Sequence, residues 1–250
     1  MKYLLFFVCS LLLLSACSNE EDILYSDLKN TELTRGENNS LVYPMSSFIT
    51  KINLDLKDEG IVNAYLNGMQ NEFGKWYLPL FVKLKAEPIA EITRGSTGTK
   101  SKAPAAYFAS QNILVFLTGS TISENGVHEE LIHAGQQRIY PGGIVQYGQK
   151  EGTPNIEFEA KLTQDIINCI NDLPFNLGEG LNNSTQYVQW MLEISDNGFP
   201  SMTKVLETKI SSIGYYGMVE AFSKRYEDYN YPVSMTLKPL YINYISNSIK

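Results

Sequence analysis

Residue types that commonly build catalytic or binding sites are scarce in this sequence. Among its 250 residues there are three cysteines, two histidines and two tryptophans. Cys9 and Cys17 fall in or just after an apolar N-terminal run that is expected to be processed, which leaves Cys169 as a single thiol with no disulfide partner. The apolar helical pattern around Cys169 predicts a core residue. With two tryptophans and no obvious row of exposed aromatics, the sequence gives little support for carbohydrate binding.

Positive charge is also scarce. The formal net charge is -7 and there is no basic patch to neutralise phosphate groups, so nucleic acid and anionic membrane surfaces are not expected as partners. No apolar run after the N-terminus is long enough to span a membrane, and the chain has neither an internal repeat nor a phosphate-binding glycine loop. The apolar content of 44% suffices for one sizeable core.

The first 17 residues have the pattern of a targeting segment. Lys2 precedes an apolar run over 4–14, and the segment ends in the sequence L-S-A-C at Cys17. This ending resembles the lipobox of bacterial lipoproteins, and the acidic residues within 18–22 are similar to their surface-export tether. The resemblance implies a signal peptide over 1–17, lipidation of Cys17 and a location in the cell envelope, at the outer membrane or cell surface. Membrane contact would then be through the lipid anchor alone. A plain secretory signal with an incidental cysteine is the alternative.

The remaining chain divides into a tether and one domain. Residues 18–43 are polar and poor in aromatics, which predicts a flexible tether, and a single domain is expected over 44–250. Apolar residues spaced three and four apart predict helices in this domain, and continuous apolar runs predict strands. The expected helices are 57–73, 121–140, 157–170, 184–196, 202–210, 215–226 and 237–249; the expected strands are 76–82, 105–110 and 112–118; a loop is expected over 93–102.

Both histidines lie in one predicted helix, in the stretch V-H-E-E-L-I-H-A-G-Q-Q-R from Val127 to Arg138. Thr121 and Glu124 form a capping-box pattern that predicts the start of this helix, and the Pro-Gly-Gly sequence over 141–143 would end it. A helix that carries histidine and glutamate about one turn apart is the sequence form of a zinc site, in which two side chains bind the metal and a glutamate activates water. The zinc signature H-E-x-x-H separates its histidines by four positions, whereas the two histidines here are five apart.

Helix geometry leaves three interpretations of this stretch open. At about 100° per residue, His128 and His133 lie roughly 140° apart on a regular helix, whereas Glu129 and His133 lie about 40° apart. In the first interpretation Glu129 and His133 bind the metal and Glu130 is the general base. In the second, a one-residue π-bulge brings His128 and His133 together. In the third, His128, Glu129 and Glu130 form a solvated helix face with no metal.

Residues further along the chain favour a metal site in this stretch. His133-Ala134-Gly135-Gln136 and the later Glu157-Phe158-Glu159-Ala160 resemble the H-A-x-Q and E-x-x-A segments of gluzincin-type, zincin-like metallopeptidases. The resemblance covers about residues 113–170. It departs from the family at Glu129, which stands where the family has its first histidine. A carboxylate in that place donates more charge to zinc, makes a bound water less acidic and favours harder ions.

The resemblance implies an α+β, zincin-like fold, with a small sheet beside the motif-bearing helix and a mainly helical C-terminal half. It implies further that Glu129, His133 and Glu157 hold zinc while Glu130 takes a proton from water. Glu159 is the alternative to Glu157, because a helical wheel places it near the apolar stripe, where a carboxylate usually has a partner or a metal. His128 is the alternative ligand in the bulged register.

Two functions are expected from these residues. The first is a lipid-anchored metallopeptidase that hydrolyses a peptide or protein through a remodelled zinc site. The second is a non-catalytic lipoprotein on a zincin scaffold that binds a peptide or a surface polymer in the same cleft. An oxyanion-stabilising tyrosine is usual in the family, and the sequence does not distinguish among the tyrosines over 215–244.

Overall fold

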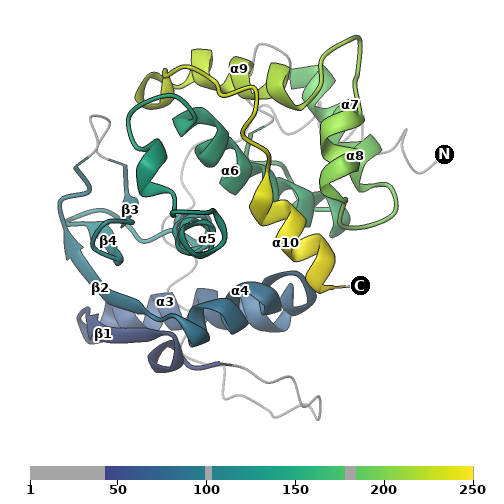
Figure 1. Cartoon of the computed structure of the whole chain (residues 1–250). Coiled ribbons are helices and arrows are strands. Elements are labelled where there is room, and N and C mark those ends of the chain that lie inside the picture. The colour runs from purple at the N-terminus through teal and green to yellow at the C-terminus, as the bar shows by residue number, and fades with distance from the viewer. Residues whose placement is uncertain (1–42, 99–102, 178–183, 250) are drawn as a thin grey trace, which may run out of the picture. The chain divides into compact units, whose positions relative to one another are not determined.

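The structure is a computed structural model that describes residues 43–98, 103–177 and 184–249. The described part combines a four-stranded sheet with eight α-helices, which confirms the α+β class (Figure 1). The predicted signal peptide, Cys17 and the tether over 18–42 lie outside the described residues. None of the described helices is long and apolar enough to cross a membrane.

The elements follow the chain in a fixed order. The strands are β1 (Ile49–Asn53), β2 (Ile89–Gly95), β3 (Ala105–Phe108) and β4 (Ile113–Leu117). The α-helices are α3 (Leu56–Asn71), α4 (Gly74–Ala86), α5 (Glu124–Ile139), α6 (Thr153–Ile170), α7 (Ser184–Ser195), α8 (Met202–Glu207), α9 (Tyr215–Arg225) and α10 (Leu240–Ser248). Short 3-10 helices are η1 (Met45–Ser47), η2 (Val145–Tyr147) and η3 (Glu227–Tyr229). The helices predicted after residue 183 are therefore confirmed as α7 to α10.

The sheet has the strand order β1-β2-β4-β3. β1, β2 and β4 are parallel, while β3 is antiparallel to β4 and forms one edge. The strands predicted over 105–110 and 112–118 are confirmed as β3 and β4. β4 is a run of five apolar residues whose middle three are buried, as expected for a strand covered on both faces.

Residues 74–86 form the helix α4, so the strand predicted over 76–82 is wrong. An almost continuous apolar run hides the helical period, which appears only in which side chains are buried: Leu78 and Val82 are exposed. Pro79 removes one helical hydrogen bond, and burial of the inner face of α4 offsets that loss. The buried residues of that face include Tyr77, Leu80, Phe81 and Leu84.

The loop predicted over 93–102 is wrong at its start, because β2 continues to Gly95. Arg94 holds this end of the strand in place. Its guanidinium donates to both carboxylate oxygens of Asp58, at 2.7 and 2.8 Å, and to the backbone carbonyls of Leu117 and Ser120. The contacts of Arg94 therefore stabilise the end of β2, a strand that the composition of this segment did not predict.

Helix α5 is surrounded by other elements. It packs against α3, α4, α6, α10 and β3, and Figure 1 shows it end-on with β3 and β4 on one side and α10 on the other. Its N-cap is Ser123, whose hydroxyl oxygen accepts from the backbone N–H of Gly126, so the capping box assigned to Thr121 is wrong. A Cβ at Gly135 would lie 2.7 Å from the side chains of Leu80 and Tyr241, so only glycine permits this close packing.

Helix α6 contributes to two apolar clusters. One cluster joins it to the sheet and to α3, α4 and α5, and the other joins it to α7, α8 and α9. Phe158 lies at the centre of the second cluster, in ring contact with Tyr187, Tyr215 and Phe222. Cys169 is half-buried against the same cluster, as expected for a packing residue. With both sides of α6 fixed by packing, the polar residues of its first turns are held in one orientation toward α5.

Candidate metal centre

Three predicted ligands meet where α5 and α6 pack together. Glu129 and His133 lie one turn apart on α5, Glu157 lies in the second turn of α6, and one ligand atom from each lies within 4.8 Å of the others. The Nε2 atom of His133 is 3.3 Å from Glu157 Oε2 and 4.0 Å from Glu129 Oε1. The structure therefore brings together the two positions of the H-A-x-Q helix and the first position of the E-x-x-A helix.

The site is enclosed rather than solvated. The side chains of His133, Glu129 and Glu157 are 7%, 15% and 22% exposed, and Glu130 is buried. This helix face is therefore not solvated, which contradicts that part of the third interpretation; whether a metal binds stays a prediction. Carboxylates held this far from water need a cation or several hydrogen-bond donors.

His133 is oriented by Gln136, one turn further along α5. The amide nitrogen of Gln136 donates to the carbonyl oxygen of Ile156 at 3.0 Å and to Glu159 Oε2 at 2.7 Å. Both partners only accept, so the amide oxygen must face His133 Nδ1, 2.8 Å away. Nδ1 therefore carries the hydrogen and Nε2 is directed at the carboxylates, the arrangement that a metal-binding imidazole requires.

Glu159, the alternative third ligand, has a structural role instead. It is fully buried and accepts from the Tyr140 hydroxyl and the Gln136 amide at one oxygen, and from the backbone N–H groups of Tyr241 and Ile242 at the other. Burial raises its pKa to about 7 despite these donors. The expectation that a carboxylate near the apolar stripe has a partner is confirmed, and the partners are hydrogen-bond donors of the protein.

Glu130 lies beside the cluster but is not one of its three candidate ligands. Burial raises the pKa of Glu130 to about 8, with the charges of His133, Glu129 and Glu157 acting on it as well. In the metal-free protein Glu130 therefore holds its own proton at neutral pH, and a cation bound at the cluster would lower its pKa and favour the charged carboxylate.

Two further residues of the site were not assigned from the sequence. Lys161 Nζ lies 2.5 Å from Glu129 Oε1, and the Tyr229 hydroxyl lies close enough to Glu157 to help lower the pKa of that carboxyl. The spacing of four between Glu157 and Lys161 places them on one face of α6, but no local pattern marks Lys161 as part of the site. Tyr229 is brought in from η3 by tertiary packing, with its ring stacked on Phe222 at 5.4 Å, so no local pattern distinguishes it from its neighbours.

The charges of the cluster change its proton affinities. Burial lowers the pKa of His133, but the carboxylates of Glu157, Glu130 and Glu129 raise it to a net value of about 10. Burial raises the pKa of Glu157, yet His133 and Lys161 bring it below its usual value. In the metal-free protein His133 is therefore protonated and paired with Glu157, so metal binding at Nε2 would release a proton.

The donor set fits a divalent cation. Ligand atoms bound at about 2.0–2.2 Å around a tetrahedral zinc ion lie roughly 3.3 Å apart, which matches the separation of His133 Nε2 and Glu157 Oε2. The separation between His133 and Glu129 is longer, at 4.0 Å. Two carboxylates and one imidazole suit zinc and also harder ions such as manganese.

His128, the alternative ligand, lies elsewhere. Helix α5 is α-helical throughout its length, so the π-bulge that would bring the two histidines together does not occur. His128 is buried with Nδ1 3.4 Å from the Tyr77 hydroxyl, and Nε2 has no hydrogen-bond partner and lies 3.8 Å from Glu124 Oε1. It is a packing residue of the α4–α5 contact.

Burial of His128 predicts a pH-dependent stability. Burial lowers the pKa of His128 from 6.5 to about 4, so as the pH falls the unfolded chain takes up a proton before the folded one. Its contribution is complete above pH 6.5 and is lost as the pH falls to 4, up to about 3 kcal/mol. Urea unfolding of the metal-free protein should show this loss, and the variant His128→Phe, which cannot titrate, should lack it. Equal pH slopes for the two proteins would contradict the assignment.

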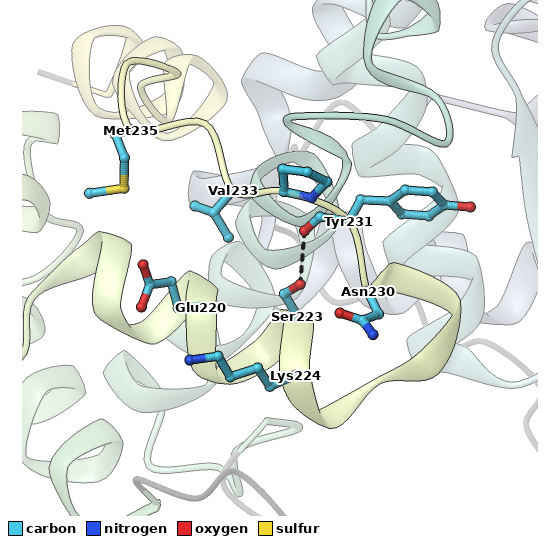
Figure 2. A pocket seen from close by; sticks show the side chains of 8 residues that line it. Glu220, Ser223, Lys224, Asn230, Tyr231, Val233 and Met235 are labelled. Carbon is cyan, nitrogen blue, oxygen red and sulfur yellow. Dashed lines mark hydrogen bonds between the residues drawn. The ribbon is translucent and has the colours of Figure 1, made fainter.

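A surface hollow of about 500 Å³ lies between α9 and the segment that follows η3 (Figure 2). Within it the Ser223 hydroxyl donates to the Tyr231 carbonyl oxygen, which holds that segment against α9. The lining contains none of the candidate ligands, so this hollow is separate from the metal centre. Its residues are Glu220, Ser223, Lys224, Asn230, Tyr231, Pro232, Val233 and Met235.

Comparisons with known proteins add no assignment. No family model, curated protein or solved structure matches this chain. The functional argument therefore depends on the residues and geometry of the site itself.

Proposed function

We propose that this chain is a zincin-like, metal-dependent hydrolase of the peptidase type, held in the cell envelope by a lipid on Cys17. The convergence of Glu129, His133 and Glu157 in an enclosed site is the observation that carries the proposal. The matches to H-A-x-Q and E-x-x-A in the sequence support it, because those two segments supply His133 and Glu157, two of the three residues that meet in space.

The residues around the ion would divide the work of hydrolysis. A bound zinc ion acidifies water and polarises a carbonyl group. Gln136 keeps the Nε2 atom of His133 directed at the site, and Glu130 accepts the proton of the attacking water and passes it to the leaving amine. Tyr229, whose hydroxyl already reaches Glu157, is placed to donate to an oxygen on which charge develops.

The edge of the sheet supports a peptide as the substrate. β3 is the edge strand, antiparallel to β4, and packs against α5, the helix that carries two of the candidate ligands. An edge strand offers backbone groups to which an extended peptide can add as a further strand. A peptide bound in this way would run alongside α5.

A second candidate function is a non-catalytic lipoprotein that binds a peptide or surface polymer on the same scaffold. The observation in its favour is the ion pair between Lys161 and Glu129, which neutralises one candidate ligand without a metal. The two functions share the fold and differ in whether a metal ion occupies the site.

Metal analysis distinguishes the two functions. Protein purified without chelator and without a histidine tag is expected to contain close to one equivalent of a divalent ion, or to take up one on titration. The variant Glu129→His restores the four-residue histidine spacing and is expected to bind zinc more tightly by on the order of ten-fold, about 1.4 kcal/mol of binding free energy.

His128→Ala is the matched control, because His128 lies outside the cluster and its loss should leave zinc affinity unchanged. A site that stays empty on titration would exclude the peptidase and leave the binding function. Loss of zinc binding in His128→Ala, with no gain in Glu129→His, would reverse the assignment of ligands.

A further inference from the structure

Lys161 lies among the candidate metal ligands, where a cationic side chain is unusual because it would repel a metal ion. It lies on α6 one turn after Glu157 and its side chain is 19% exposed. Burial alone would lower the pKa of Lys161, but the carboxylates of Glu129, Glu157 and Glu130 raise it, so the side chain is an ammonium ion inside the cluster. The cluster thus contains a positive charge supplied by the protein itself.

Lys161 contacts the oxygen of Glu129 that lies toward His133. Glu129 Oε1 is 4.0 Å from His133 Nε2, and the same oxygen lies 2.5 Å from Lys161 Nζ. The separation of 4.0 Å exceeds the roughly 3.3 Å expected between two ligands of one zinc ion. The pair with Glu157, which Lys161 does not contact in this way, has the expected separation of 3.3 Å.

The charge balance also opposes simultaneous occupancy. Burial keeps Glu130 mostly protonated at neutral pH, so the carboxylates of Glu129 and Glu157 are already balanced by the two cations His133 and Lys161. A divalent ion a few ångströms from an ammonium group would meet a repulsion twice that between two unit charges. Since the lysine stem is flexible and its side chain is partly exposed, the ammonium group has a route to solvent.

We propose that Lys161 competes with the divalent ion for Glu129, so that the centre has a lysine-paired state and a metal-loaded state. This inference rests on the proposed metal site and adds a residue that determines its affinity. Lys161 stabilises the carboxylates when no ion is bound, and binding of an ion displaces its ammonium group from Glu129 toward solvent.

The variant Lys161→Met tests the competition, because methionine keeps an unbranched stem and removes the charge. Zinc affinity, measured by competition with a chromophoric chelator, should increase by about ten-fold or more, and the melting temperature of the metal-free variant should fall. Lys161→Arg keeps the charge and is the matched control, with an affinity near that of the natural protein.

A second measurement uses the unchanged protein. Amine-reactive labelling followed by mass spectrometry should modify Lys161 slowly in the metal-free protein and faster after zinc saturation, with the exposed Lys51 as an internal reference. Equal zinc affinity in the natural protein and Lys161→Met, or labelling of Lys161 that zinc does not change, would overturn the competition while leaving the metal site intact. Absence of zinc binding in both proteins would overturn the proposed function together with the competition.

Discussion

Replacing Glu130 by glutamine is expected to lower peptide hydrolysis by about 10²- to 10⁴-fold while metal content stays the same. Glu130 is buried beside the cluster and is not one of the three candidate ligands, so the change removes a proton acceptor and leaves the donor set in place. Hydrolysis of a peptide library and metal analysis of the same samples provide the two measurements. Unchanged hydrolysis would exclude Glu130 as the base.

The same variant has a second expected effect, on stability. The pKa of Glu130 is raised by burial to about 8, so its favourable contribution to stability is present below pH 4.5 and is lost as the pH rises through 8. Metal-free Glu130→Gln has no such loss and should exceed the natural protein in stability at alkaline pH. Glu193→Gln, at an exposed position of α7, is the control and should change neither hydrolysis nor stability.

Replacing Glu159 by alanine is expected to lower the free energy of unfolding by about 3–5 kcal/mol. The change removes the acceptor of the buried backbone N–H groups of Tyr241 and Ile242. It also removes one of two acceptors from Tyr140 and from Gln136, which keep the carbonyl oxygens of Lys238 and Ile156. Thermal and urea unfolding measure the loss directly. Where the variant remains folded, zinc affinity should also fall by about 10- to 100-fold, because Gln136 no longer fixes the imidazole of His133.

Glu157→Gln is the matched control, since it replaces a carboxylate two positions earlier on the same helix. It should lose most metal binding but less stability than Glu159→Ala, because it removes the charged partner of His133 and leaves the hydrogen bonds that hold α10 in place. If Glu159→Ala were as stable as the natural protein, the four contacts would not hold α5, α6 and α10 together. If it lost stability and kept full zinc affinity, the orienting role of Gln136 would be wrong.

The parts of the site that could be predicted are those that depend on the spacing of residues within one helix. Helical geometry paired Glu129 with His133, which are one turn apart, and the resemblance to the E-x-x-A segment added Glu157; these three side chains do converge. The same geometry correctly separated His128 from His133. The metal, the chemistry and the lipid anchor stay predictions.

What could not be predicted depends on contacts between distant segments. Tyr229 reaches Glu157 only because η3 packs on α6, and the acceptors that orient Gln136 come from another helix. Residues 76–82 have the composition of a strand and are helical because α3, α5 and α10 cover one face of α4. The spacing of apolar residues indicates the secondary structure that a segment prefers locally, whereas in these places packing against distant segments determines the structure.

The hydrogen bonds from α10 to Glu159 also bear on the stage of folding at which the candidate metal centre forms. Glu159 and its backbone donor at Tyr241 are 82 positions apart, so we expect the docking of α10 on Glu159 to be a late, long-range step. Until α10 docks, the two motif-bearing helices can pair, but Glu159 lacks the two backbone donors that fix it beside Gln136. Competence to bind a metal should thus appear as a final folding event, after most of the secondary structure has formed, so an ion would bind the finished domain rather than assist its assembly.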